Sequence, residues 1–162
     1  MTPKGKNLLL IAIAGGTFLL DQITKLVIVK TMALYQTIPV IPGFFNITRV
    51  HNPGGAFGFM AGQTHGIRAM VFLVISILAA CFILYLYKKT DAGYPFLLAS
   101  LALIFGGALG NLADRIRFGE VIDFLDFYIQ AVHYPAFNVA DSAICVGMTV
   151  LIYHILFKKI PM

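Results

Sequence analysis

Charged side chains are scarce in this chain of 162 residues: Asp, Glu, Lys and Arg make up 12% of it, whereas hydrophobic residues make up 59%. A typical soluble domain is about 25% charged and about 45–50% apolar. The scarcity excludes a disordered chain and most soluble folds. The net charge is +5, but the basic residues form no face or run. We therefore expect no nucleic-acid partner and interpret the charge as a marker of membrane topology.

Cysteine and the common catalytic motifs are also rare or missing. Cys81 and Cys145 each lie inside a long apolar run, so we predict neither a disulfide framework nor a metal site. The sequence contains no C-x-x-C, no H-E-x-x-H and no G-x-S-x-G. These absences disfavour a membrane metalloprotease and a serine protease. We expect no metal and no cofactor.

Long apolar segments dominate the chain instead. A helix that crosses a hydrocarbon core of about 30 Å needs about 20 mostly apolar residues. The segment near the N-terminus is long and carries Asp21, so we interpret it as a span and not as a cleaved signal peptide. The sequence thus predicts one integral membrane domain, residues 1–162, of the all-α membrane class. Its four transmembrane helices are predicted at about 8–29, 67–87, 95–112 and 139–157.

Two longer segments connect these spans on one side of the membrane. Residues 30–66 contain prolines, a glycine cluster and an alternating stretch, which indicates short strands and turns. Residues 114–136 carry Val121, Ile122, Leu125 and Ile129 at roughly helical spacing, which predicts a short amphipathic helix at the interface.

The lysines set the orientation of the spans. Short loops that are rich in Lys and Arg usually lie on the cytoplasmic side of the membrane. Three lysine pairs fall in short segments that share one side, which places both termini in the cytoplasm and the two long segments outside. These pairs are Lys4 and Lys6, Lys88 and Lys89, and Lys158 and Lys159.

Six of the seven acidic residues map to the outer ends of the spans or to the outer segments. Charged groups near a bilayer core are costly and are candidates for function. Asp91 lies in the inner loop beside lysines and is interpreted as a solvated residue. The six outer acids are Asp21, Asp114, Glu120, Asp123, Asp126 and Asp141.

Asp123 and Asp141 are the two candidates for acid–base chemistry. Asn138 is a plausible N-cap of the fourth span, with Asp141 three residues later, so Asp141 is either a capping carboxylate or a catalytic base kept ionised by the helix N-terminus. Asp123 has apolar neighbours, and burial there raises the pKa of a carboxyl group. Two close carboxyls share a proton and can hydrolyse an amide without a metal. Asp126 is interpreted as solvated.

Polar residues at the outer ends of spans one and three allow a structural interpretation. Asp21 precedes Lys25 by four residues, which favours an ion pair on the helix surface. Asp114 has Arg115 as a neighbour, and Arg115 either pairs with it or reaches a lipid phosphate. Asn111 needs partners at membrane depth. Interhelical contacts are the structural interpretation of Asn111, Asp114 and Arg115, and the surface ion pair is that of Asp21.

Two other function classes remain compatible with these acids. A small transporter or ion-conducting subunit uses acids as a proton or cation relay, but predicts them along the membrane depth rather than in one layer. A non-enzymatic assembly factor uses them as interhelical contacts. An assay for amide hydrolysis separates the two-carboxyl enzyme from both.

Five motifs in order resemble one family, and together they cover nearly the whole chain. The family is lipoprotein signal peptidase, or signal peptidase II, a family of aspartyl proteases. One position departs from its pattern, because Gly55 stands where the family more often has alanine. The motifs are Leu20-Asp21-Gln22-Ile23-Thr24-Lys25, Asn52-Pro53-Gly54-Gly55-Ala56-Phe57, Gly110-Asn111-Leu112-Ala113-Asp114-Arg115, Val121-Ile122-Asp123-Phe124 and Phe137-Asn138-Val139-Ala140-Asp141.

The resemblance implies a protease of the bacterial inner membrane that acts at the periplasmic face. Such enzymes cut prolipoproteins just before a diacylglyceryl-modified cysteine. It implies that Asp123 and Asp141 are the catalytic dyad and that Asp114 is structural. It also implies a small β-cradle between spans one and two and a periplasmic helix before span four. We expect membrane lipids and the modified prolipoprotein as partners, and a monomer. The matching residues that line or support the site are Asp21, Asn52, Gly54, Asn111, Arg115 and Asn138.

Overall fold

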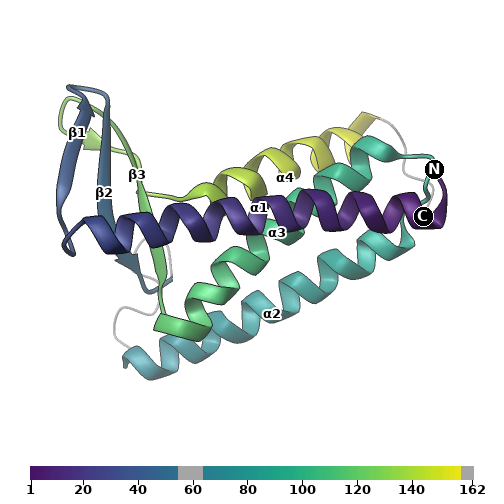
Figure 1. Ribbon diagram of the computed structural model, residues 1–162, viewed down its shortest axis with the longest axis horizontal. Coiled ribbons are helices and arrows are strands. Elements are labelled where there is room, and N and C mark those ends of the chain that lie inside the picture. The colour runs from purple at the N-terminus through teal and green to yellow at the C-terminus, as the bar shows by residue number, and fades with distance from the viewer. Residues whose placement is uncertain (55–63, 158–162) are drawn as a thin grey trace.

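Four long helices and one four-stranded sheet make up the computed structural model, which describes residues 1–54 and 64–157. Helices of 19 to 29 residues alternate in direction, and the sheet stands at one end of the bundle, away from the N-terminus (Figure 1). The elements are α1 Pro3–Thr31, β1 Thr37–Ile41, β2 Phe45–Asn52, α2 His65–Lys89, α3 Pro95–Phe118, β3 Val121–Ile129, β4 Val132–His133 and α4 Val139–Phe157.

All four predicted spans are confirmed as helices that are long and apolar enough to cross a membrane. α3 is the central helix. Within an apolar stretch of 18 residues, 56% of its residues are buried inside the protein, against 11–22% in the other three helices. Large apolar side chains on α1, α2 and α4 face outward, as expected where lipid is the solvent. The site is therefore built around the end of α3 that lies next to the sheet.

Small residues let α1 and α4 approach α3 closely. A Cβ on Gly106 would lie 2.6 Å from the carbonyl oxygen of Ala14 in α1. A Cβ on Gly107 would lie 2.5 Å from the carbonyl oxygen of Ala140 in α4. These contacts pack α1 and α4 closely against α3.

At the opposite end, α1 is fastened to the loop between α2 and α3. The Lys6 ammonium donates to the carbonyl oxygens of Lys88 and Thr90 at 3.0 and 2.7 Å. The Tyr87 hydroxyl donates to the Lys6 carbonyl at 2.6 Å. The lysines of the first two predicted inner segments thus gather at the end far from the sheet. Lys158 and Lys159 lie outside the described residues.

The strands predicted between spans one and two are confirmed as β1 and β2, and the sheet order is β1-β2-β3-β4 with antiparallel neighbours. The helix predicted within residues 114–136 is wrong. α3 continues to Phe118, and Gly119 then ends it with a left-handed φ of 75°, a conformation that glycine adopts freely. The residues after it form β3 and β4.

Burial on both faces of β3 explains why its pattern looked helical. Its first four residues, Val121 to Phe124, are all buried, so the strand lacks the alternation of a one-sided strand. The fold is thus helical in the membrane with a sheet at one end, and not all-α throughout.

Candidate active site

β3 carries Asp123 into the junction between the sheet and the helices. The Asp123 side chain is 2% exposed. Its Oδ1 accepts a hydrogen bond of 2.7 Å from Asn138 Nδ2, and its Oδ2 accepts one of 2.9 Å from Asn52 Nδ2. Both oxygens are therefore held by neutral amide donors.

α4 presents Asp141 to the same junction from its first turn. Asn138 caps this helix: its Oδ1 accepts from the Asp141 backbone N–H at 2.9 Å, and Asp141 Oδ2 accepts from the Asn138 backbone N–H at 3.2 Å. The predicted capping role of Asn138 is confirmed by this reciprocal pair. Asp141 Oδ1 takes no part in this cap and accepts a hydrogen bond of 2.7 Å from Asn111 Nδ2.

Asn138 therefore touches both candidate carboxyls. Its side-chain amide binds Asp123 and its backbone N–H binds Asp141. The neighbouring Phe137 exchanges two backbone hydrogen bonds with Leu125 of β3 at 2.8 and 3.1 Å, which fixes the segment against the sheet. The sheet and the N-terminus of α4 thereby hold Asp123 and Asp141 in one site.

The two carboxyls differ in environment. Burial, and to a smaller extent the negative charge of Asp141, raise the pKa of Asp123 to about 7, against the lowering effect of hydrogen bonds from Asn52 and Asn138 and of the charge of Lys25. Asp141 is partly exposed and lies in the first turn of α4, where the helix dipole favours an anion. The geometry suits an acid on the strand and a base on the helix.

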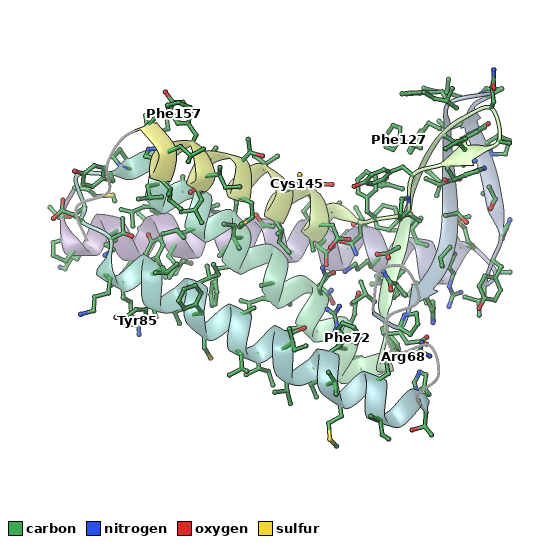
Figure 2. The ribbon with its side chains drawn as sticks, turned by 180° about the vertical axis from the view of Figure 1, so that it is seen from behind. Arg68, Phe72, Tyr85, Phe127, Cys145 and Phe157 are labelled. Atoms are coloured by element: carbon green, nitrogen blue, oxygen red, sulfur yellow. The ribbon has the colours of Figure 1, made fainter. Side chains whose placement is uncertain are left out.

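Asn52 and Gly54 form a tight turn beside Asp123. The Gly54 backbone N–H donates to Asn52 Oδ1 at 2.9 Å, so the amide nitrogen of Asn52 is left to face the carboxyl. Gly54 has a φ of 87°, and a Cβ there would lie 2.5 Å from the Phe72 ring of α2. Arg68 and Phe72 lie toward the sheet end of α2, and Tyr85 toward the other end (Figure 2). Gly55, Ala56 and Phe57 of the same motif lie outside the described residues.

Asp21, Lys25 and Asp114 form a buried ionic cluster behind the site. Lys25 Nζ lies 2.9 Å from Asp21 Oδ2 and 2.7 Å from Asp114 Oδ2, and the three side chains are at most 2% exposed. The predicted Asp21–Lys25 pair is confirmed, but its predicted surface location is wrong because α3 and α4 cover it. Asp114 pairs with Lys25, and this pairing across helices was not visible in the sequence.

The same cluster ties the helix bundle to the sheet. Asp21 Oδ1 accepts from the Ala140 backbone N–H at 2.9 Å, next to the start of α4. Asp114 Oδ2 accepts from the Ile122 backbone N–H at 3.2 Å, next to Asp123. Besides their ion pairs with Lys25, Asp21 and Asp114 therefore contact the two elements that carry the candidate acids, α4 and β3.

Arg115 is the last predicted support residue. Its Nη1 lies 3.3 Å from the Asn111 carbonyl oxygen one turn earlier. The guanidinium lies near enough to Asp123 and Asp141 to interact with their charge. No salt bridge joins Arg115 to a carboxylate within the described ranges 1–54 and 64–157.

Two outer acids lie away from this constellation. Asp126 accepts from Asn46 Nδ2 and from His133 Nδ1, each at 2.8 Å, and is buried, so the predicted solvated position is wrong. Glu120 lies 3.3 Å from His51 Nδ1 and 3.1 Å from His65 Nε2. In the described part of the chain, no three His, Cys, Asp or Glu side chains are arranged to hold a metal ion.

Comparisons with known proteins agree with this architecture. The family model described as "Signal peptidase (SPase) II" matches residues 13–157. The chain is 55% identical to a protein named lipoprotein signal peptidase from Desulforapulum autotrophicum, over 88% of each chain. It is 51% identical to one of the same name from Geobacter sulfurreducens, over 86% of each chain.

A solved structure described as a bacterial membrane enzyme has the same fold. It superposes with a TM-score of 0.80 at 35% identity and covers 94% of this chain and 92% of its own. The family model spans both ends of the described site, from α1 to α4. The chain belongs to the signal peptidase II family of aspartic peptidases.

Proposed function

We propose that this chain removes the signal peptide from diacylglyceryl-modified prolipoproteins, cutting just before the lipidated cysteine, with Asp123 and Asp141 as the catalytic dyad. Family membership and the name shared by its relatives support the substrate class. One observation carries the dyad: a buried carboxyl and a helix-terminal carboxyl are held by the same residue, Asn138.

The proposed reaction uses the two carboxyls in different states. Asp141, ionised, takes a proton from a water molecule, and the resulting hydroxide attacks the scissile carbonyl carbon. Asp123, protonated, donates its proton to the carbonyl oxygen. The proton on Asp141 then passes to the leaving nitrogen as the C–N bond breaks. A hydroxyl of the tetrahedral intermediate gives its proton back to Asp123, so the pair again holds one shared proton. The raised pKa of Asp123 supports its assignment as the acid.

The remaining polar groups serve the substrate. Asn52 and Gly54 frame one side of Asp123, and Arg115 lies near both acids. We assign them to the substrate backbone and to the region around the modified cysteine. The signal helix enters laterally among the spans, and its lipid tails stay in the bilayer.

Charge supports the orientation. Lys6, near the start of α1, contacts Lys88, near the end of α2. These helix ends lie at the end of the bundle opposite the sheet (Figure 1). By the positive-inside rule this end faces the cytoplasm. The sheet and the dyad then lie at the outer face of the inner membrane, where the signal peptides of exported lipoproteins are accessible. The proposed enzyme works as a monomer.

The test is cleavage of a diacylglyceryl-modified precursor by the purified full-length chain in detergent. Asp123→Asn and Asp141→Asn should each lose cleavage while remaining folded. Asp126→Asn is the matched control, because Asp126 lies three residues from Asp123 on the same strand but binds Asn46 and His133.

Each part of the proposal has its own contrary result. Cleavage at near wild-type rate by either dyad variant would refute the assignment of the dyad. Equal cleavage of precursors with and without the diacylglyceryl group would refute the proposed substrate class.

A further inference from the structure

A buried ammonium group, that of Lys25, is connected to the proposed dyad through a single side chain, Asn111. Lys25 is 2% exposed, and its Nζ has three acceptors: Asp21 Oδ2 at 2.9 Å, Asp114 Oδ2 at 2.7 Å and Asn111 Oδ1 at 2.9 Å. An ammonium group has three N–H donors and no acceptor. Two of these donors meet carboxylates that balance its charge. The third donates to the neutral side-chain amide of Asn111, which in turn donates to Asp141.

The contact with Lys25 determines which way the Asn111 amide faces. An amide has one acceptor end and one donor end, and a flipped amide would direct its NH₂ group at the ammonium. With Oδ1 on Lys25, Nδ2 must point the other way, and it lies 2.7 Å from Asp141 Oδ1. A flip would turn an oxygen toward the Asp141 carboxylate and replace two attractions with two repulsions.

Asn138 is the other donor near Asn111 Oδ1, and it cannot fix this orientation as firmly. Its Nδ2 lies 2.7 Å from Asp123 Oδ1 and 3.2 Å from each of two further acceptors, Ile122 O and Asn111 Oδ1. One NH₂ group has two hydrogens for these three oxygens. The shortest bond goes to Asp123, which leaves a shared hydrogen for Asn111.

We propose that Lys25 is a positioning residue for the catalytic base: it orients the Asn111 amide, and this amide in turn orients the Asp141 carboxylate. No ion pair or hydrogen bond joins Lys25 to Asp123 or Asp141 within residues 1–54 and 64–157. Among the described residues, the hydrogen-bond route from Lys25 to Asp141 therefore runs through Asn111. The charge of Lys25 also acts on Asp123 through space, and this effect does not need Asn111. The inference rests on the proposed function of the dyad.

A double-mutant cycle measures whether the effect passes through Asn111. Lys25→Met keeps the length of the side chain and removes its three donors, and Asn111→Leu removes the amide at similar volume. The assay is cleavage of the diacylglyceryl-modified precursor by the full chain in detergent. Each single variant should lower kcat by about ten- to a hundred-fold with KM unchanged, the size expected for a hydrogen bond to a charged group. The double variant should be no slower than Asn111→Leu alone.

A purely structural role for Lys25 gives a different result. The two losses in kcat would then multiply in the double variant, and this would overturn the proposal. Lys6→Met is the matched control, because Lys6 is also in α1 and binds carbonyl oxygens at the far end of the bundle. It should leave kcat as in the wild type.

Loss of Lys25 leaves two buried carboxylates without their cation, so Lys25→Met can fail to fold. The cycle is then repeated in an Asp114→Asn background, where removing Lys25 restores the net charge of the native cluster. If Lys25→Met fails to fold there too, the ammonium is needed for folding and the proposal is wrong. A wild-type chain that leaves the precursor uncut would instead refute the proposed function.

Discussion

Removing the Asn52 amide should move the pH dependence of cleavage toward alkaline pH. Asn52 Nδ2 donates to Asp123 Oδ2 at 2.9 Å. This bond lowers the pKa of Asp123 and burial raises it, and with both effects present the pKa is about 7. Asn52→Ala removes a donor that favours the ionised form, so the pKa of Asp123 rises further. Because Asp123 must be protonated to act as the acid, the alkaline limb of the profile follows its pKa.

The size of the shift follows from the strength of the bond. A hydrogen bond to a charged group contributes about 1.5–3 kcal/mol, and one pKa unit corresponds to about 1.4 kcal/mol. Asn52 is exposed, so water replaces part of the lost bond, and we expect a shift of about one unit. The ratio of kcat/KM at pH 8 to that at pH 6 should rise from about 0.1 to about 0.5. The ratio is insensitive to a uniform loss of activity.

Asn46→Ala is the control for this experiment. Asn46 lies on the same strand and donates to the other buried aspartate of β3, Asp126, at 2.8 Å. Its removal should leave the ratio unchanged. If Asn52→Ala leaves the ratio at the wild-type value, or if both asparagine variants raise it equally, the assignment of Asp123 as the acid is refuted.

Two further predictions concern stability. Gly110→Ala should destabilise the protein in thermal unfolding by about 1–3 kcal/mol, because a Cβ there would lie 2.5 Å from Asp21 Oδ2; Gly15→Ala, with nothing within 4 Å, is the control, and equal losses would contradict the close contact. Asp126 should make unfolding pH-dependent. Burial opposes its ionisation, but hydrogen bonds from Asn46 and His133 lower its pKa below that of a free aspartate. Ionised Asp126 therefore stabilises the fold above the pKa of a free aspartate, and this stabilisation is lost as the pH falls through the lowered pKa. In Asp126→Asn, the unfolding midpoint should depend less on pH below pH 4 than in the wild type. An unchanged dependence would contradict the role of Asp126.

The spans could be predicted from sequence because the requirement for a helix in lipid is local: about 20 apolar residues in a row satisfy it without reference to the rest of the chain. The strand at Val121–Ile129 could not, because its backbone hydrogen bonds go to β2, some 75 residues earlier. Its hydrophobic pattern is continuous since both faces are buried, and a continuous pattern fits a helix equally well.

The candidate site shows the same division. The capping pair of Asn138 and Asp141 is three residues apart and was recognisable as a motif. Lys25 was placed correctly beside Asp21, four residues earlier, but its bonds to Asp114 and Asn111 join helices whose packing the sequence does not reveal. Its burial, and hence its importance, depends on glycines that bring α1 and α3 together.

The three asparagines of the site follow one rule, which explains why amides and not cations hold the two acids. In each, the side-chain oxygen accepts a hydrogen bond from a protein N–H and the side-chain nitrogen donates one to a carboxyl. The N–H donor is the Gly54 backbone for Asn52, the Lys25 ammonium for Asn111 and the Asp141 backbone for Asn138.

A Lys or Arg in direct contact would strongly favour the ionised form of its carboxyl and prevent it from carrying a proton near neutral pH. A neutral N–H fixes the orientation of the carboxyl at a smaller cost to its basicity. In the part of the chain that the structure describes, no salt bridge reaches Asp123 or Asp141, and the cation nearest to them in the hydrogen-bond network acts through an amide. In a Lys25→Met background, where two buried ammonium groups cannot meet, Asn111→Lys should therefore pair directly with Asp141 and cleave more slowly than Asn111→Leu. Cleavage at the rate of Asn111→Leu or faster would show that the separation of charge from the dyad is not required.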